Sequence, residues 1–167
     1  LQRAPAFRTI VTFQARSGDL AGALETARMI KRERERAGAL AMIAGIQSEF
    51  EGVDEALGTA AAIESPLHRI TALILIAKTQ YDEGDDKGFE EMLALALETA
   101  RSMDDGRKKA AAYGIVAALE AEWGTPVGAE EAIKAIEDAR EQEFAWRVME
   151  SVRERREIDV FGFWLGN

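Results

Sequence analysis

Apolar and polar residues recur along the first half of the chain at a spacing of 33 residues, and no gap is needed to align them. The clearest matching series are Ile10, Ile43 and Ile76; Gln14, Gln47 and Gln80; Ala6, Ala39 and Ala72; and Phe7, Leu40 and Leu73. A fixed period of this length indicates supersecondary units that each stack on the next, because one unit alone cannot bury its apolar face.

One unit has the pattern of two amphipathic helices. Phe7, Ile10, Val11 and Gln14 have the i, i+3, i+4, i+7 spacing of a single helix face, which we expect to be buried. A second helix is expected from about Leu20 to Arg32. We call the first helix of each unit the A helix and the second the B helix.

A glycine turn separates the two helices. In Gly18-Asp19 the glycine can adopt positive φ after the A helix, and the aspartate can cap the B helix. Gly84-Asp85 repeats this turn, and Gly124-Thr125-Pro126 is a variant of it. Gly52 lies one residue later than the register requires, so the second turn is expected to be reshaped.

The third unit contains an insertion of seven residues. Glu98-Thr99-Ala100-Arg101 repeats Glu25-Thr26-Ala27-Arg28 at a distance of 73, which is twice 33 plus seven. Seven residues make about two helical turns, so they lengthen a helix and keep its faces aligned. The extra residues lie between Gly84 and Ala96, which predicts that the helix around 86–103 is the longest B helix by about two turns.

Beyond the insertion the register continues through Val116 and Met149, which predicts an all-α repeat array in one domain of residues 1–157. The expected units are about 4–36, 37–69, 70–109 and 110–142, followed by a terminal helix over 143–157.

The turn and B helix of the first unit carry a resemblance to a known family. Gly18-Asp19-Leu20-Ala21-Gly22-Ala23-Leu24 resembles the glycine-aspartate turn of tetratricopeptide (TPR) repeats, and Trp146 and Tyr113 fit the family's aromatic position. The chain departs from the family in its 33-residue period, in glutamine at the usual A-helix tyrosine, and in the near absence of the closing proline. The resemblance implies a right-handed α-α superhelix of about four helix-turn-helix repeats plus a terminal helix.

The resemblance also implies that the A helices line a concave face that binds a protein or peptide. Small residues dominate the implied positions, so they would either form a smooth groove or allow the helices to pack closely. The candidate binding residues on this face are Arg8, Thr12, Arg16, Ser48, Ile74, Lys78 and Tyr81.

The repeated glutamine allows two interpretations. Gln14, Gln47 and Gln80 each end the inner face of an A helix, where the side chain could bond the backbone of the adjacent turn. Alternatively, the glutamines could contact a bound strand. We favour the structural interpretation, because the position aligns with a helix–helix contact.

Net charge argues against nucleic acid as a partner. The chain carries a formal charge of −9, whereas phosphate binding requires a basic surface. The run Lys31-Arg32-Glu33-Arg34-Glu35-Arg36 is diluted by its glutamates and is interpreted as a solvated junction between helices. No apolar run approaches the roughly 18–20 residues that span a bilayer.

The sequence lacks the cysteine and histidine residues that common catalytic and metal-binding sites use. There is no cysteine, and the one histidine, His68, is expected to be an exposed surface or capping residue. Carboxylate pairs such as Asp82-Glu83, Asp85-Asp86 and Asp104-Asp105 lie at expected turns, where aspartate caps helices. We therefore expect no enzyme activity, no cofactor and no metal site.

The C-terminal segment 158–167 is unusually apolar and includes Phe161, Phe163 and Trp164. Repeat arrays need their last apolar face covered, so we expect the segment to cap the array, with groove filling or docking on another molecule as alternatives. The sequence starts at Leu1 rather than methionine, which leaves the compartment open. A cytoplasmic location is our first expectation, and a periplasmic or secreted one is the alternative.

The predicted function is a non-catalytic scaffold that binds a protein or peptide partner. Two alternatives are a self-assembly module whose ends stack into a homo-oligomer, and an accessory repeat domain of a larger protein.

Overall fold

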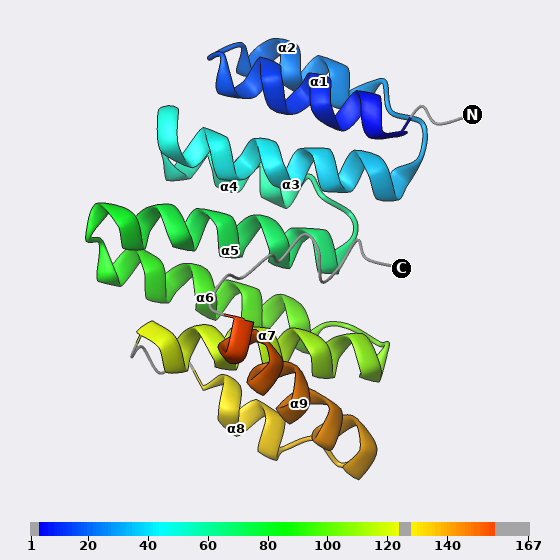
Figure 1. The fold of residues 1–167 in the computed structure, drawn as a ribbon, viewed down its shortest axis with the longest axis vertical. Coiled ribbons are helices and arrows are strands. Elements are labelled where there is room, and N and C mark those ends of the chain that lie inside the picture. The colour runs from blue at the N-terminus through cyan, green and yellow to red at the C-terminus, as the bar shows by residue number, and fades with distance from the viewer. Residues whose placement is uncertain (1–3, 124–127, 156–167) are drawn as a thin grey trace. The chain divides into compact units, whose positions relative to one another are not determined.

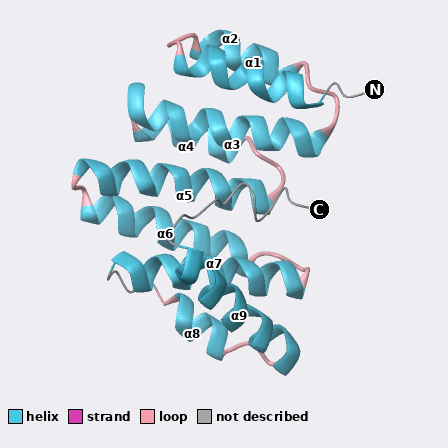
Figure 2. Ribbon diagram, in the orientation of Figure 1, coloured by secondary structure: helices cyan, strands magenta, loops and turns pink. Residues whose placement is uncertain are grey.

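The computed structural model describes residues 4–123 and 128–155, and all regular structure within these ranges is helical (Figure 2). The all-α prediction is therefore confirmed for this part of the chain. The helices are α1 (Ala4–Arg16), α2 (Leu20–Arg28), α3 (Glu33–Phe50), α4 (Val53–Ala61), α5 (Pro66–Glu83), α6 (Asp86–Arg101), α7 (Gly106–Trp123), α8 (Ala129–Lys134) and α9 (Ala139–Arg155).

The chain divides into two compact units, Leu1–Phe89 and Glu90–Asn167. In the first unit the A helices α1, α3 and α5 lie side by side, with α1 against α3 and α3 against α5 (Figure 1). The B helices α2 and α4 each pack on their own A helix and on the following one. In this unit α3 is thus held between its neighbours.

The second unit contains α7, α8 and α9. The A helix α7 packs against its B helix α8 and against the next A helix, α9, while α8 also touches α9. The arrangement within this unit repeats the pairing of α3 with α4 and α5.

The boundary between the two units falls inside α6, in the hairpin with the insertion. This helix has 16 residues, whereas α2 and α4 have nine each, a difference of seven residues or about two turns. The predicted long B helix is therefore confirmed. Its buried face repeats at helical spacing through Phe89, Leu93, Ala96 and Ala100.

Glycine and aspartate form the turns as the sequence predicts. Gly18 and Gly84 have φ of 87° and 78°, in the left-handed region that favours glycine. Asp19 and Asp85 then accept hydrogen bonds from the backbone N–H groups of residues 22 and 88, at 2.9 and 3.0 Å. The second turn is reshaped as expected, because Gly52 itself occupies the N-cap position with φ 116° and no side-chain cap. Residues 124–127 lie outside the described part of the chain.

The A helices after the first begin four residues before the expected unit boundaries, and in α3 and α5 a repeated hydrogen bond forms in the first turn. Arg36 donates to the Ile30 carbonyl oxygen at 3.3 Å, and Arg69 donates to that of Ile63 at 2.7 and 3.1 Å. Each arginine lies in the first turn of an A helix and satisfies a carbonyl after the preceding B helix. The charged run around Arg36 is thus partly helical, rather than a junction throughout.

The core of the first unit lies between successive A helices and their B helices. Ile43 and Ile46 of α3 pack in a buried cluster with Val11 and Ala15 of α1. Ile43 and Ile76 are fully buried, whereas Ile10, at the same register position in α1, is 48% exposed. The predicted burial of Ile10 was therefore wrong, because no described helix packs on that side of α1.

Truncation of the three equivalent isoleucines should test the difference in burial between Ile10 and the other two. We expect Ile43→Ala and Ile76→Ala each to lower the free energy of unfolding by about 2–5 kcal/mol, since each leaves a cavity in a filled core. Ile10→Ala, the matched control, should change it by less than about 0.5 kcal/mol, as at other exposed sites. Urea denaturation measures all three variants, and equal losses at Ile10 and Ile43 would contradict the assigned register.

Candidate binding surface

Two of the seven residues expected on a concave face are buried. Ser48 and Ile74 are 4% and 3% exposed, so neither is available to a ligand on an open surface. Ala41 and Gly45, two small residues of α3 on the same implied face, are buried as well. These positions serve packing between A helices, which is the second of the two interpretations given for the small residues.

The other five residues are at least partly accessible. Arg8 and Arg16 are exposed, and Thr12 is half-buried, with its hydroxyl donating to the Arg8 carbonyl oxygen at 2.8 Å. Lys78 pairs with Asp82 across one helical turn at 2.5 Å. Tyr81 is 42% exposed and packs edge-on against Phe89, with ring centroids 5.7 Å apart.

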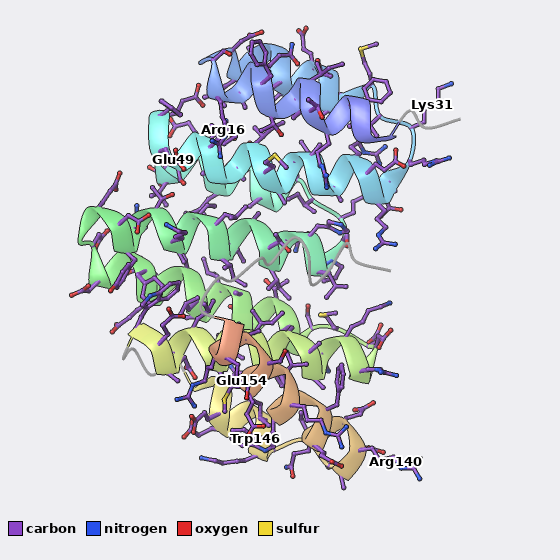
Figure 3. All side chains as sticks on the ribbon, viewed as in Figure 1. Arg16, Lys31, Glu49, Arg140, Trp146 and Glu154 are labelled. Atoms are coloured by element: carbon purple, nitrogen blue, oxygen red, sulfur yellow. The ribbon has the colours of Figure 1, made fainter. Side chains whose placement is uncertain are left out.

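Arg16 and Glu49 occupy equivalent register positions and lie at the C-terminal ends of α1 and α3, whereas Lys31 lies at the opposite end of the hairpins (Figure 3). Exposed charges thus lie at both ends of the hairpins in the first unit.

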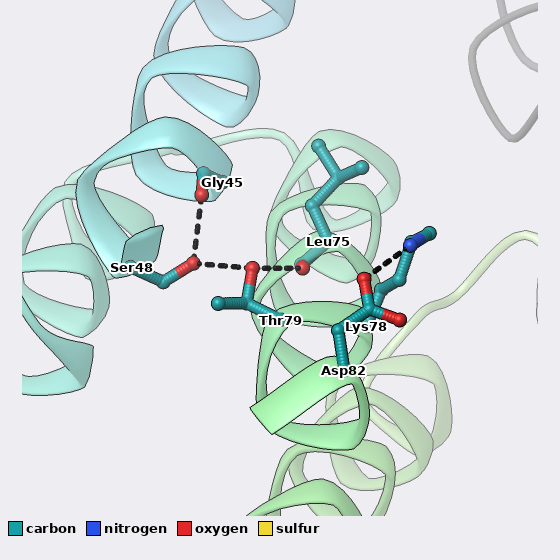
Figure 4. Close-up of polar contacts among 6 residues, drawn as sticks. All are labelled: Gly45, Ser48, Leu75, Lys78, Thr79 and Asp82. Atoms are coloured by element: carbon teal, nitrogen blue, oxygen red, sulfur yellow. Dashed lines mark hydrogen bonds and ion pairs between the residues drawn. The ribbon is translucent and has the colours of Figure 1, made fainter. Parts of the chain in front are cut away.

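The contact between α3 and α5 shows why small residues are needed (Figure 4). A Cβ on Gly45 would lie 2.9 Å from Leu75 Cβ, so the glycine allows close approach of the two helices. Beside it the Ser48 hydroxyl lies 2.9 Å from Thr79 Oγ1 and 2.7 Å from the Gly45 carbonyl oxygen. The Thr79 hydroxyl also lies 3.4 Å from the Leu75 carbonyl oxygen, so both buried hydroxyls have partners within the close packing.

The same constraint operates between α7 and α9. A Cβ on Gly114 would collide with the backbone carbonyl oxygen of Ala145 and would lie 2.9 Å from Val148 Cβ. Ala111 and Ala118, one turn to either side of Gly114, are also buried. The A helices of both units therefore pack closely through glycine and alanine.

Two of the three repeated glutamines join an A helix to its own B helix. The Thr26 hydroxyl donates to Gln14 Oε1 at 2.8 Å, and the Thr59 hydroxyl donates to Gln47 Oε1 at 2.5 Å. The partner is a threonine side chain rather than the turn backbone, but the role is structural. Gln80 instead donates to Glu83 at 3.3 Å.

Glutamate takes the glutamine position in the fourth unit, which the register step of 40 from Gln80 could have revealed. Glu120 is 7% exposed, and the N–H of Ala129 lies 3.0 Å from each of its carboxylate oxygens. Ala129 begins α8, and a helix N-terminus favours negative charge. Glu120 therefore joins α7 to its B helix.

His68 is buried, not exposed as the sequence suggested. Its side chain is 8% exposed, Nδ1 lies 2.8 Å from the Ser65 hydroxyl, and Nε2 has no hydrogen-bond partner. The neighbouring position on α3 is Gly38, which leaves room for the ring. Burial lowers the pKa of His68, Arg34 lowers this pKa further, and Glu33 opposes them.

Aspartates at the turns act as helix caps, as expected. Asp105 accepts from the N–H of Lys108 at 3.0 Å, and Asp138 accepts from the N–H groups of Arg140 and Glu141 at 2.8 and 3.0 Å. The Lys108 hydrogen bonds lower the pKa of Asp105. Among the described residues, no three histidine, aspartate or glutamate side chains are placed to hold a metal ion.

None of the described helices is long and apolar enough to cross a membrane. The predicted capping residues Phe161, Phe163 and Trp164 lie outside the described residues.

An apolar patch lies on the side of α1 that faces away from α3. Ile10 and Phe13 are 48% and 72% exposed, and Thr9 beside them is also exposed. We call these three residues the outer face of α1. The equivalent residues of α3 are Met42, Ile43 and Ile46, which pack against α1 and α2.

Two other exposed apolar side chains in the first unit, Phe50 and Met29, do not share this property. Phe50 and Met29 are 62% and 72% exposed, but their register equivalents Glu83 and Ala62 are exposed too. Single exposed apolar residues are common on protein surfaces and need no partner. Ile10 and Phe13 combine exposure with positions that the next two A helices bury.

A shallow depression of about 440 Å³ lies in the second unit, between the starts of α7 and α9. The Arg107 guanidinium carbon lies 4.8 Å from the centre of the Phe144 ring, and Arg147 pairs with Glu143. The lining residues are Arg107, Arg140, Arg147, Asp138, Glu141, Glu143 and Phe144, with three charges of each sign. The depression therefore has no net charge to select an anion or a cation.

The glycine contacts can be tested by adding a methyl group. We expect Gly114→Ala to lower the free energy of unfolding by about 1–3 kcal/mol, because the overpacking outweighs the gain in helix propensity. Gly58→Ala, in the exposed middle of α4 with open space around it, should instead raise stability by about 0.5–1 kcal/mol. Denaturant unfolding measures the change in the free energy of unfolding for both variants. Stabilisation by Gly114→Ala would contradict the close approach of α7 and α9.

Burial of His68 should make stability depend on pH near neutrality. Because its pKa is lower in the folded state, the unfolded chain takes up the proton first as pH falls below about 6.5. The free energy of unfolding should therefore fall between pH 7.5 and 5.5, and it should fall less for His68→Gln. The free energy of unfolding, measured by urea denaturation at each pH, gives one slope against pH for each protein. The difference between the two slopes separates the contribution of His68 from that of the carboxylates, and equal slopes would contradict the burial of His68.

Comparison of the chain with protein families, curated proteins and solved structures finds no match.

Proposed function

We propose that this protein is a non-catalytic scaffold that binds a protein partner through the outer face of α1. The observation that carries the proposal is the exposure of Ile10 and Phe13 at register positions that α3 and α5 bury. At those positions in α3, Ile43 and Ile46 share a buried cluster with apolar residues of the preceding A helix α1 and of its B helix α2. The partner would accordingly present a surface of apolar side chains.

The composition of this face supports a protein partner over other ligands. Thr9, Ile10 and Phe13 carry no charge, and the chain as a whole has a formal charge of −9. Nucleic acid would require basic residues, which this face lacks. Large exposed aromatic and aliphatic side chains are typical of protein contact surfaces.

Non-catalytic action is supported by the roles that the reactive side chains already fill. His68 is buried with its Nε2 atom away from solvent, and the turn aspartates accept backbone N–H groups. Glu120 is engaged by the start of α8. Among these residues, none is left as a general base beside an open cavity.

We further propose that the hairpins are TPR-like and stack with the right-handed superhelical sense of that class. Support comes from the glycine-aspartate turn, the A–B glutamine–threonine contact, and the repeated packing of A helix on A helix within each unit.

Site-specific photo-crosslinking tests the scaffold proposal in the source cell. A photoreactive phenylalanine analogue at Phe13 should give a discrete protein adduct, and Ile10→Gln in the same chain should reduce it about tenfold, the effect of losing roughly 1.4 kcal/mol of apolar contact. The same analogue at Phe50, which is exposed at a position exposed in other units, is the matched control. Equal adduct patterns at Phe13 and Phe50 would contradict the proposal.

A further inference from the structure

We propose that His68 is a proton-operated latch on the contact between α3 and α5, and that this contact opens at the start of α5 when the ring takes up a proton. Both helices belong to the first unit, and the latch is separate from the outer face of α1. Its basis is the position of the ring, the unpartnered ring nitrogen and the charges around it.

The ring of His68 lies at one end of the face through which α3 receives α5. A Cβ on Gly38 would lie 3.7 Å from His68 Cδ2 and 3.9 Å from Nε2. About two helical turns further along the same face, Gly45 of α3 meets Leu75 of α5. The start of α5 can therefore move away from Gly38 while the contact at Leu75 stays closed.

One nitrogen of this buried ring has no hydrogen-bond partner. Nδ1 lies 2.8 Å from the Ser65 hydroxyl, whereas Nε2 is buried and unpartnered. A protonated imidazole is a donor at both nitrogens and carries a positive charge. The closed contact would then bury a charged donor without an acceptor, which is costly. Water satisfies that donor only when the ring leaves the contact.

The charges around His68 do not offset this cost. Burial lowers the pKa of His68, Arg34 of α3 lowers it further, and Glu33 of α3 raises it without providing an acceptor for Nε2. Other charged residues of α4, of the loop that follows it and of the first turn of α5 are not among the groups that shift this pKa: Asp54, Glu55, Glu64 and Arg69. The closed contact therefore favours the neutral ring.

The equivalent position in three other A helices carries a charged side chain with access to water. The residues are Glu35 of α3, Lys108 of α7 and Glu141 of α9, and each is at least partly exposed. Among these four helices, α5 is the one that buries the residue at this position, and a histidine is the side chain whose charge changes near neutral pH. A charge at this position of the repeat is thus accommodated in contact with water, as the protonated ring requires.

Acid should accordingly shift the closed contact towards the open one while the helices stay folded. The exposed ring takes up its proton near the ordinary pKa of about 6.5, whereas the buried ring resists protonation. The state that binds the proton more tightly gains as pH falls. Between pH 7.5 and 5.5 the ratio of open to closed contact should rise by up to about tenfold.

Solvent access to the ring tests the latch by NMR spectroscopy, because His68 is the one histidine in the chain. In protein labelled on histidine and on isoleucine methyl groups, a soluble paramagnetic agent should broaden the His68 signal up to about tenfold more at pH 5.5 than at pH 7.5. The methyl signals of Ile43, in the core cluster of α1, α2 and α3, should stay protected at both values. Unchanged protection of His68, or joint exposure of His68 and Ile43, would overturn the proposal.

Two substitutions at Gly38 separate the missing hydrogen-bond partner from packing. Gly38→Ser places a hydroxyl within reach of Nε2, so the protonated ring gains an acceptor inside the closed contact. The increase in broadening on acidification should then shrink from about tenfold to about twofold or less. Gly38→Ala, the matched control, adds the same Cβ at an ordinary contact distance without the hydroxyl and should leave the increase unchanged. Equal behaviour of the two variants would contradict the latch.

Discussion

Close packing between successive A helices is the constraint on which the rest of the structure depends. An A helix has apolar residues on both sides, so a single hairpin leaves one side in water. The next A helix covers that side only if small residues let it approach. Gly45 between α3 and α5 and Gly114 between α7 and α9 provide this approach, and an added Cβ at either position would meet the neighbouring helix.

The polar groups of the repeat are arranged around this packing. The Ser48–Thr79 hydrogen bond pairs hydroxyls inside the A–A contact, and Gln14 and Gln47 join each A helix to its B helix through threonine. Arg36 and Arg69 satisfy carbonyl oxygens at the junctions between hairpins. Polar residues recur with the apolar ones because each repeat leaves the same backbone and side-chain groups without partners.

Much of the fold can be predicted from the sequence, because helical periodicity and glycine-aspartate turns are local signals. The 16-residue α6 follows from the distance between two copies of one short motif. Burial is harder to predict, because it depends on the neighbouring helices. Ile10 and Ile43 have the same register but different surroundings, and His68 follows a proline at a helix start yet fits beside Gly38. Ser48 and Ile74 were assigned to a binding face for the same reason, since periodicity identifies the side of a helix but not what covers it.

Solvent accessibility of the three equivalent isoleucine methyl groups tests the central claim most directly. In methyl-labelled protein at a concentration low enough to be monomeric, a soluble paramagnetic agent should broaden the Ile10 signal strongly and leave those of Ile43 and Ile76 almost unaffected. This result would show that the preceding A helix, and not the residue type or its register, decides burial. Protection of Ile10 equal to that of Ile43 in the monomer would contradict the account.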